Sequence, residues 1–308
     1  MSFIGKIAYL ALFPGALSLL LAGAAARGTL EAVSAVLKAP RDTPSASLYS
    51  IYERFSAEPA RAGFLSSAVL WTAPPARLFA VSWVVCVVTG FLDGDTVLVF
   101  FLMLLALAAQ LVVPRTSGEP VGVSMENAAV LGCAVALALA LAGVSLRTGE
   151  VEVASIISWQ VRNGFLVASS AGGALARSGS ILGLVGALVA GLALMGLRPF
   201  RRAGPAGSQG DAREGLSGPP LAALQVSDAA MLIAAPLLVV SLFMAGGASN
   251  FYEIAFWALK VLGVVVLCGV IDAVACRFAR RRALAFVSGA GCAAALAGFL
   301  LVWIGASL

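Results

Sequence analysis

Long apolar blocks constrain this chain more than any other feature of its sequence. Eight such blocks lie at approximately 7–26, 76–92, 96–113, 127–146, 180–197, 229–246, 254–275 and 283–305. A hydrocarbon core of about 30 Å needs roughly 20 apolar residues in a helix. The blocks therefore predict an all-α, polytopic membrane protein with about eight transmembrane helices, forming a single membrane domain over residues 1–308.

Composition excludes a soluble enzyme. Hydrophobic residues make up 61% of the chain, charged residues only 11%, and the mean hydropathy is +1.00. A soluble domain carries roughly 25% charged residues. Transmembrane β-barrels are built from short alternating segments, whereas the apolar residues here come in long blocks, which favours helices.

The residue types that hold metals and cofactors are scarce. Histidine is absent, which excludes a histidine-based metal site, haem ligation through histidine or a histidine proton relay in this chain. No two of the five cysteines are spaced as CxxC, and most lie in apolar blocks, so we interpret them as buried free thiols. The glycine-rich run at 172–179 fits close helix packing better than a phosphate site. We expect no metal or cofactor site in this chain.

Basic residues predict the orientation in the membrane. Most of the 20 fall in the connections after the first, third, fifth and seventh blocks: Arg27, Lys38, Arg41, Arg54, Arg61, Arg77, Arg115, Arg198, Arg201, Arg202, Arg213, Arg277, Arg280, Arg281 and Arg282. The positive-inside rule places these connections in the cytoplasm and both termini on the outer side of the cell membrane. The net charge of +5 thus reflects topology, and we expect no nucleic-acid binding.

Three connections have distinct compositions. Residues 27–75 contain apolar residues at helical spacing and predict amphipathic segments in a cytoplasmic connection. Residues 198–228 are rich in glycine and proline and predict a cytoplasmic loop. The outer connection at 147–179 contains a segment near Trp159 that predicts a short interfacial helix.

Two charged residues fall within the seventh block. Lys260 and Asp272 are twelve residues apart, or about 18 Å along a helix, so they cannot pair directly. A charge inside a membrane usually faces a protein interior or a wet cavity and marks a functional site. Alternatively, Asp272 lies at the interface beside Arg277 and the following arginines, and the Lys260 side chain extends toward the membrane surface.

Other carboxylates lie at the edges of blocks. Glu126 and Asp228 stand where the fourth and sixth blocks begin, and a helix N-terminus favours negative charge. Asp211 and Glu214 lie in the glycine-rich loop, where solvation is the ordinary state. Together with Lys260 and Asp272, these acids form a candidate proton pathway that tends toward the cytoplasmic half.

Several short patches resemble the H-type membrane subunit of respiratory complex I and of energy-converting membrane-bound hydrogenases and formate hydrogenlyase. Lys260, Asp272 and Arg277 reproduce the spacing found in hydrogenase-type members. The segment that starts at Gly94 resembles the third span of the family, and Glu126 in SMENAAVL falls on an acid of the family. Further matches are Pro44, Tyr49, Arg54, Pro199, Phe200, Asp211, Glu214, Gly215, Ser217 and Gly218.

The chain also departs from the family pattern. Arg201 stands where the family has an aspartate, residues 203–210 are a glycine and proline run where acids are expected, and the basic segment after the first span is mostly lost. These regions shape the quinone chamber in complex I. Their loss argues against quinone chemistry and favours a divergent, hydrogenase-type member.

The resemblance implies a non-catalytic membrane subunit that docks a peripheral redox arm and links electron transfer to proton or sodium movement. Docking would involve Pro199, Phe200, Arg201 and Arg277. The implied partners are hydrogenase-like large and small subunits, an iron–sulfur protein and antiporter-like membrane subunits, with iron–sulfur clusters and a nickel–iron centre in those partners. The alternatives are a stand-alone secondary transporter, which the absence of paired broken spans disfavours, and a purely structural anchor.

Overall fold

The computed structural model describes residues 3–11, 15–37, 64–112, 120–169, 171–200, 218–244, 251–275 and 280–307, and these residues form ten helices. The helices are α1 (Phe3–Ala11), α2 (Ala16–Val36), α4 (Phe64–Val88), α5 (Thr96–Val112), α6 (Pro120–Thr148), α7 (Val153–Asn163), α8 (Gly173–Met195), α9 (Pro219–Phe243), α10 (Phe251–Ala275) and α11 (Arg280–Ser307). The all-α, multi-pass fold is therefore confirmed.

Seven helices in the described residues are long and apolar enough to cross a membrane, and α5 is a shorter apolar helix. The first of the seven is Ala16–Val36, which corrects the predicted span at 7–26. The sequence carries Pro14–Gly15 in the middle of the predicted span, and this pair is a strong turn signal. Residues 27–36, expected in a connection, consequently belong to α2.

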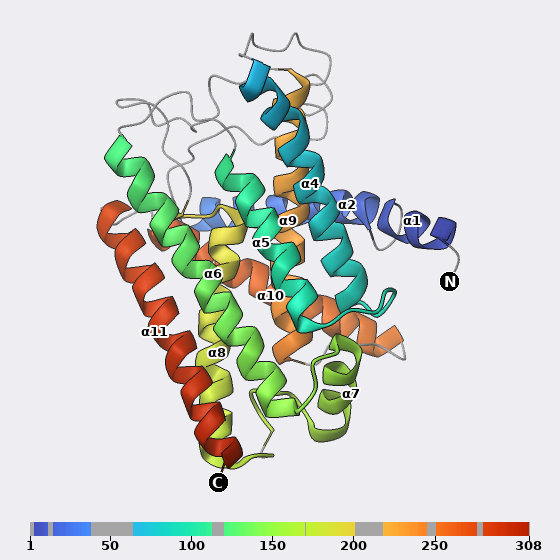
Figure 1. The fold of residues 1–308 in the computed structure, drawn as a ribbon, viewed down its shortest axis with the longest axis vertical. Coiled ribbons are helices and arrows are strands. Elements are labelled where there is room, and N and C mark those ends of the chain that lie inside the picture. The colour runs from blue at the N-terminus through green and yellow to red at the C-terminus, as the bar shows by residue number, and fades with distance from the viewer. Residues whose placement is uncertain are drawn as a thin grey trace.

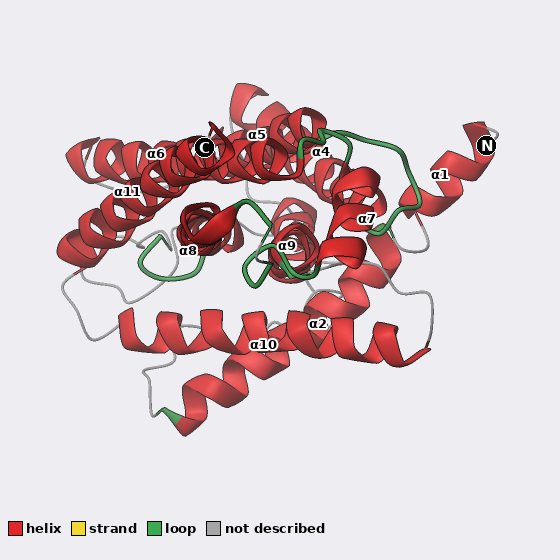
Figure 2. Ribbon diagram, turned by 90° about the horizontal axis from the view of Figure 1, so that it is seen from below, coloured by secondary structure: helices red, strands yellow, loops and turns green. Residues whose placement is uncertain are grey.

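Two helices form the centre of the molecule. Figure 2 looks nearly along α8 and α9, which lie between a row made of α6, α11, α5 and α4 and a second layer made of α2 and α10. Of the candidate spans, the one in α9 is the most enclosed, while those in α2, α10 and α11 have the smallest buried shares. α2 and α10 run across the bundle rather than along it (Figures 1 and 2).

Small residues allow α8 and α11 to pack backbone to backbone. A Cβ at Gly179 would lie 2.6 Å from the carbonyl oxygen of Gly298, and one at Gly298 would lie 2.6 Å from the backbone nitrogen of Gly183. Membrane helices commonly associate through such small residues, because dispersion contacts replace the hydrophobic driving force there. This contact agrees with the packing role predicted for the run at 172–179.

The central helices run in opposite directions and define two ends. α8 ends beside the middle of α9, because Gly191 faces Ala235 and Gly183 faces Phe243. We call the end of the bundle where α9 begins, toward which α8 points, the α8–α9 end; the C-terminal end of α9 lies beside α7, and we call that the α7 end. α7 is the short helix predicted near Trp159. α9 begins at Pro219, so residues 219–228, assigned to the loop at 198–228, are helical instead.

A backbone bridge closes the α7 end beside the short helix α5. The backbone N–H of Thr96 donates to the carbonyl of Val151 over 2.9 Å, and that of Val153 donates to Gly94 over 3.0 Å. The Asp95 side chain caps α5 by accepting a hydrogen bond from the Leu98 N–H at 2.6 Å. The turn after α4 is therefore tied to the turn before α7.

Candidate functional site

Arg77 lies inside a helix and not in a connection, which corrects its predicted position. It falls in the middle of α4, three turns from the helix start, and only 1% of its side chain is exposed. α4 continues through Pro74 and Pro75, which immediately precede this part of the helix. A fully buried arginine requires partners for its charge and its donors, because an isolated buried charge is very unfavourable.

The partners of Arg77 come from three other helices. Its Nη1 forms an ion pair with Oδ1 of Asp228 in α9, whose side chain is 21% exposed. Its Nη2 donates to Oε1 of Gln110 in α5 at 3.2 Å and to the carbonyl of Leu194 in α8 at 2.9 Å. We call Arg77, Gln110, Leu194 and Asp228 the arginine site.

The arginine site stabilises the C-terminal end of α8. A helix leaves its last carbonyls without intrahelical donors, and its C-terminus favours positive charge. Gly196 ends α8 in the left-handed conformation at φ 64°, and the N–H of Leu197 returns to the carbonyl of Leu192. Arg77 supplies the donor for Leu194. A side chain at Gly196 would also crowd Gln110, whose Nε2 lies 3.4 Å from the Cβ position.

Asp272 reaches the same helix end from α10. Its Oδ1 accepts a hydrogen bond from the backbone N–H of Arg198, three residues after the end of α8, at 2.7 Å. Asp272, which the sequence places in a candidate proton pathway, thus has a backbone group as its partner among the described residues. Two charged side chains from different helices, Arg77 and Asp272, consequently hold the end of α8 and the residues that follow it.

The segment Arg198–Phe200, which we call the loop root, is anchored in the protein. Phe200 is 3% exposed and Pro199 is also buried, so these two predicted docking residues contribute to packing. The Phe200 N–H donates to the carbonyl of Leu197 at 2.8 Å. Arg201, Asp211, Glu214 and Arg277 lie outside the described residues, as do Pro44, Tyr49 and Arg54.

The sequence predicts that Asp228 stands at the start of its helix, and the structure corrects this prediction. α9 starts nine residues earlier, at Pro219, and the carboxylate stabilises Arg77 rather than a helix N-terminus. α2 covers this position closely, because a Cβ at Gly23 would collide with the backbone carbonyl of Ala229. The site is therefore enclosed by α2 as well as by α4, α5 and α8.

Lys260 lies at the α7 end, which corrects the expectation that the charged residues cluster in one half. Its Nζ donates to the carbonyl of Met244 at the end of α9 over 2.6 Å. The same Nζ lies 4.1 Å from the ring centre of Phe165 and 4.8 Å from that of Phe256, within cation–π range. Lys260 and Asp272 have separate partners at separate helix ends, in agreement with their predicted separation.

The arginine site includes two residues that sequence reasoning missed. The positive-inside argument places Arg77 in a connection, and it does not involve Gln110. A usable signal was present, since Arg77 and Gln110 are polar residues within predicted apolar blocks and Asp228 adjoins a third. Opposite charges in separate spans commonly pair. Glu126 lies in the second turn of α6, which begins six residues before it, at Pro120.

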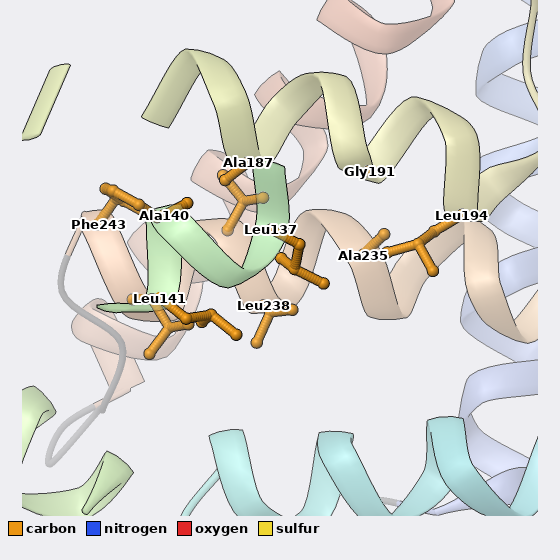
Figure 3. A pocket seen from close by; sticks show the side chains of 11 residues that line it. Leu137, Ala140, Leu141, Ala187, Gly191, Leu194, Ala235, Leu238 and Phe243 are labelled. Atoms are coloured by element: carbon orange, nitrogen blue, oxygen red, sulfur yellow. The ribbon is translucent and has the colours of Figure 1, made fainter. Parts of the chain in front are cut away.

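Two cavities in the described part of the chain are small and apolar. Figure 3 shows one between α6, α8 and α9, lined by Leu137, Leu141, Ala187, Gly191, Leu194 and Phe243 among others, with a volume of about 10 Å³. An apolar cavity of this size, about one water molecule, stays dry. Of the four cysteines in the described residues, all are free and three, Cys86, Cys133 and Cys268, are buried.

The fold just described is that of a polytopic, all-helical membrane protein. The sequence matches no family model and no curated protein sequence. The structure, however, is similar to a chain in the membrane-bound sulfane sulfur reductase, an archaeal respiratory membrane complex. The TM-score is 0.73 at 18% sequence identity, and the match covers 93% of this chain and 98% of that chain. The likeness shows that the two chains share a fold over nearly their whole lengths.

Proposed function

We propose that this chain is a membrane subunit of a multisubunit, complex I-like respiratory oxidoreductase, and specifically its H-type subunit. The full-length likeness to a chain of a respiratory membrane complex supports the general assignment. The patches around Lys260, Asp272 and Pro199 support the specific one. The chain docks the peripheral redox arm in the cytoplasm and links electron transfer to proton or sodium movement.

The observation that carries this proposal is the buried Arg77–Asp228 ion pair beside the loop root. Arg77 joins Asp228 to the carbonyl of Leu194, and Asp272 holds the Arg198 N–H four residues further on. A displacement of the loop root by a docked redox arm changes the donors around the end of α8. Breaking the ion pair leaves the Asp228 carboxylate without the cation that faces it.

The remaining predicted residues extend the pathway. On the cytoplasmic side, ions reach Asp228 by way of Glu126, Asp211 and Glu214. The pathway then continues along α10, which carries Asp272 and Lys260. Arg201 and Arg277 flank the docking surface. Both termini lie on the outer side of the cell membrane in this arrangement.

Electron transfer takes place in partner subunits. The proposed partners are an iron–sulfur protein, antiporter-like membrane subunits and a hydrogenase-like pair of large and small subunits carrying a nickel–iron centre. The likeness to a sulfane sulfur reductase complex supports a second candidate for the arm, one that reduces sulfur compounds instead of protons.

Purification of this chain from gently solubilised membranes tests the assignment. We expect iron–sulfur and antiporter-like subunits to accompany it, identified by mass spectrometry, and metal analysis to find iron. Nickel in stoichiometric amount supports the hydrogenase-like arm, and its absence with iron present supports the sulfur-reducing arm. A lone chain or homo-oligomer without iron contradicts the proposal and favours a stand-alone transporter.

The coupling role is tested in the assembled complex with Asp228→Asn and Asp228→Glu. Asparagine keeps the shape of the side chain but neither takes up nor releases a proton near neutral pH. We therefore expect ion movement per electron to fall about tenfold or more in Asp228→Asn, while Asp228→Glu retains most of it. Phe286→Leu, an exposed residue of α11, is the control. Equal coupling in all three variants points to a purely structural anchor.

A further inference from the structure

α10 combines an exposed position with two specific polar contacts. Only 28% of its candidate span is buried, and Figure 2 shows the helix lying lengthwise across α8 and α9. Its apolar packing is limited to one side, where Gly269 allows a close approach by Leu30 and Val33 of α2. Lys260 and Asp272 add specific polar contacts to this packing.

Lys260 contacts a group of carbonyls at the end of α9. The carbonyl of Met244 accepts a hydrogen bond from Lys260, while Nε2 of Gln160 in α7 donates to the carbonyls of Ser241 and Leu242 at 3.1 and 3.0 Å. The last carbonyls of a helix need such donors, and a cation is favoured there. Side chains from α7 and α10 thus cap α9 together.

Asp272 makes the complementary contact at the end of α8. The residues that follow α8 offer a backbone N–H at Arg198, which the Asp272 carboxylate accepts, while Arg77 donates to the carbonyl of Leu194 within α8. Because α8 and α9 are antiparallel, with Gly183 beside Phe243 and Gly191 beside Ala235, their C-terminal ends point in opposite directions and are offset along the bundle. Twelve helical residues span about 18 Å, so one rigid helix connects both ends.

We propose that α10 is a strut whose two polar residues, Lys260 and Asp272, lock the C-terminal ends of α9 and α8 to one another. Both are positioning residues in this role. A displacement of the loop root at Arg198 is transmitted through Asp272 along α10 to Lys260 and the end of α9. The strut is a property of the fold and is measured without turnover, so its failure is distinguishable from failure of the proposed function.

Hydrogen–deuterium exchange of the full chain in lipid nanodiscs tests the strut. The two variants are Asp272→Leu and Lys260→Met, which remove the hydrogen bond but keep an apolar side chain. We expect each variant to speed exchange about tenfold in peptides covering 192–200 and also in peptides covering 238–246. Leu262→Ala, an exposed change on the same helix, is the matched control and leaves both regions unchanged.

The pattern across the two regions decides the outcome. If each variant speeds exchange only at the helix end that it contacts, the two residues are independent caps and the strut is overturned. Unchanged exchange at both ends overturns it as well.

The conservative variants Asp272→Asn and Lys260→Arg keep an acceptor and a donor at the same places. We expect both to hold exchange within about twofold of the native chain. Loosening by Asp272→Asn as large as that by Asp272→Leu also contradicts the proposal, since the hydrogen bond to Arg198 then does not hold the helix end. These variants keep the test informative if a leucine or methionine variant fails to fold.

Discussion

We expect substitution of Arg77 to lower the stability of the chain more than any other single substitution. Its side chain is fully buried and joins Asp228, Gln110 and Leu194. Removing one member of a buried ion pair leaves the other charge uncompensated, which costs about 3–5 kcal/mol, whereas removing both together is often close to neutral. The partners of this residue, and not its own charge alone, therefore determine the cost.

We expect Arg77→Met and Asp228→Leu each to lower the thermal stability of the purified chain strongly, and the double variant to recover most of the loss. The reason is that the double variant buries no unpaired charge. Melting in detergent micelles, followed by intrinsic tryptophan fluorescence, measures all members of the cycle. Additive losses in the double variant contradict the pairing.

Arg147 is a second cation that is held mainly by carbonyls. It lies near the end of α6 and donates to the carbonyls of Ala176 and Ser169 at 2.8 Å and of Ala171 at 3.2 Å, as well as to the Ser180 hydroxyl. Its planar fork serves several acceptors at once, which a lysine ammonium cannot reproduce.

We accordingly expect Arg147→Lys to destabilise the chain by about 1–3 kcal/mol, because several of these acceptors lose their donor. The local signature is increased proteolysis or hydrogen exchange in the connection between α7 and α8. Arg162→Lys, in an exposed position on α7, is the matched control. Equal effects of the two substitutions contradict the bridging role of Arg147.

At the scale of the helices, some glycines have room for an added methyl group and others do not. At Gly191 in α8 an added Cβ meets Ala235 at 3.8 Å, an ordinary contact beside the small cavity. At Gly298 in α11 it meets the backbone of α8 at 2.6 Å. Glycine inside a helix is itself unfavourable by roughly 0.5–1 kcal/mol relative to alanine.

Gly191→Ala is therefore expected to raise the stability of the chain by up to about 1 kcal/mol, while Gly298→Ala lowers it by separating α8 from α11. The same melting experiment compares the two single-methyl additions directly. A loss of stability in both variants would show that the cavity beside Gly191 has no room for the methyl group.

The sequence is sufficient to predict most of the helices, but it is insufficient to predict the contacts between them. Apolar blocks locate the spans because length and hydropathy are local properties, and the short helix near Trp159 follows from its own pattern. The first span is displaced because Pro14–Gly15 acts as a boundary inside an apolar run. Arg77 and Asp228 lie 151 residues apart, so only the tertiary packing of α4 on α9 reveals the pair.

At the scale of the whole molecule, the proposed orientation is directly measurable. Ser158 is exposed in α7, and Arg282 is exposed at the start of α11, toward the α8–α9 end. In a background without native cysteines, we expect an impermeant maleimide to label Ser158→Cys in intact cells. Arg282→Cys is labelled only after permeabilisation, because its end of the bundle faces the cytoplasm. The reverse pattern contradicts the positive-inside assignment.

The short helix α5 has a consequence for the surrounding bilayer. Its 17 residues span about 26 Å, less than the roughly 30 Å thickness of a hydrocarbon core. Such a mismatch is met by local thinning of the lipid or by polar chain entering the hydrocarbon edge. The bridge between 94–96 and 151–153 pairs two backbone donors of this turn, the N–H groups of Thr96 and Val153, which reduces the cost of bringing it toward the hydrocarbon edge. The apolar helix surface that α5 presents to neighbouring lipids is thus shorter than that of α11.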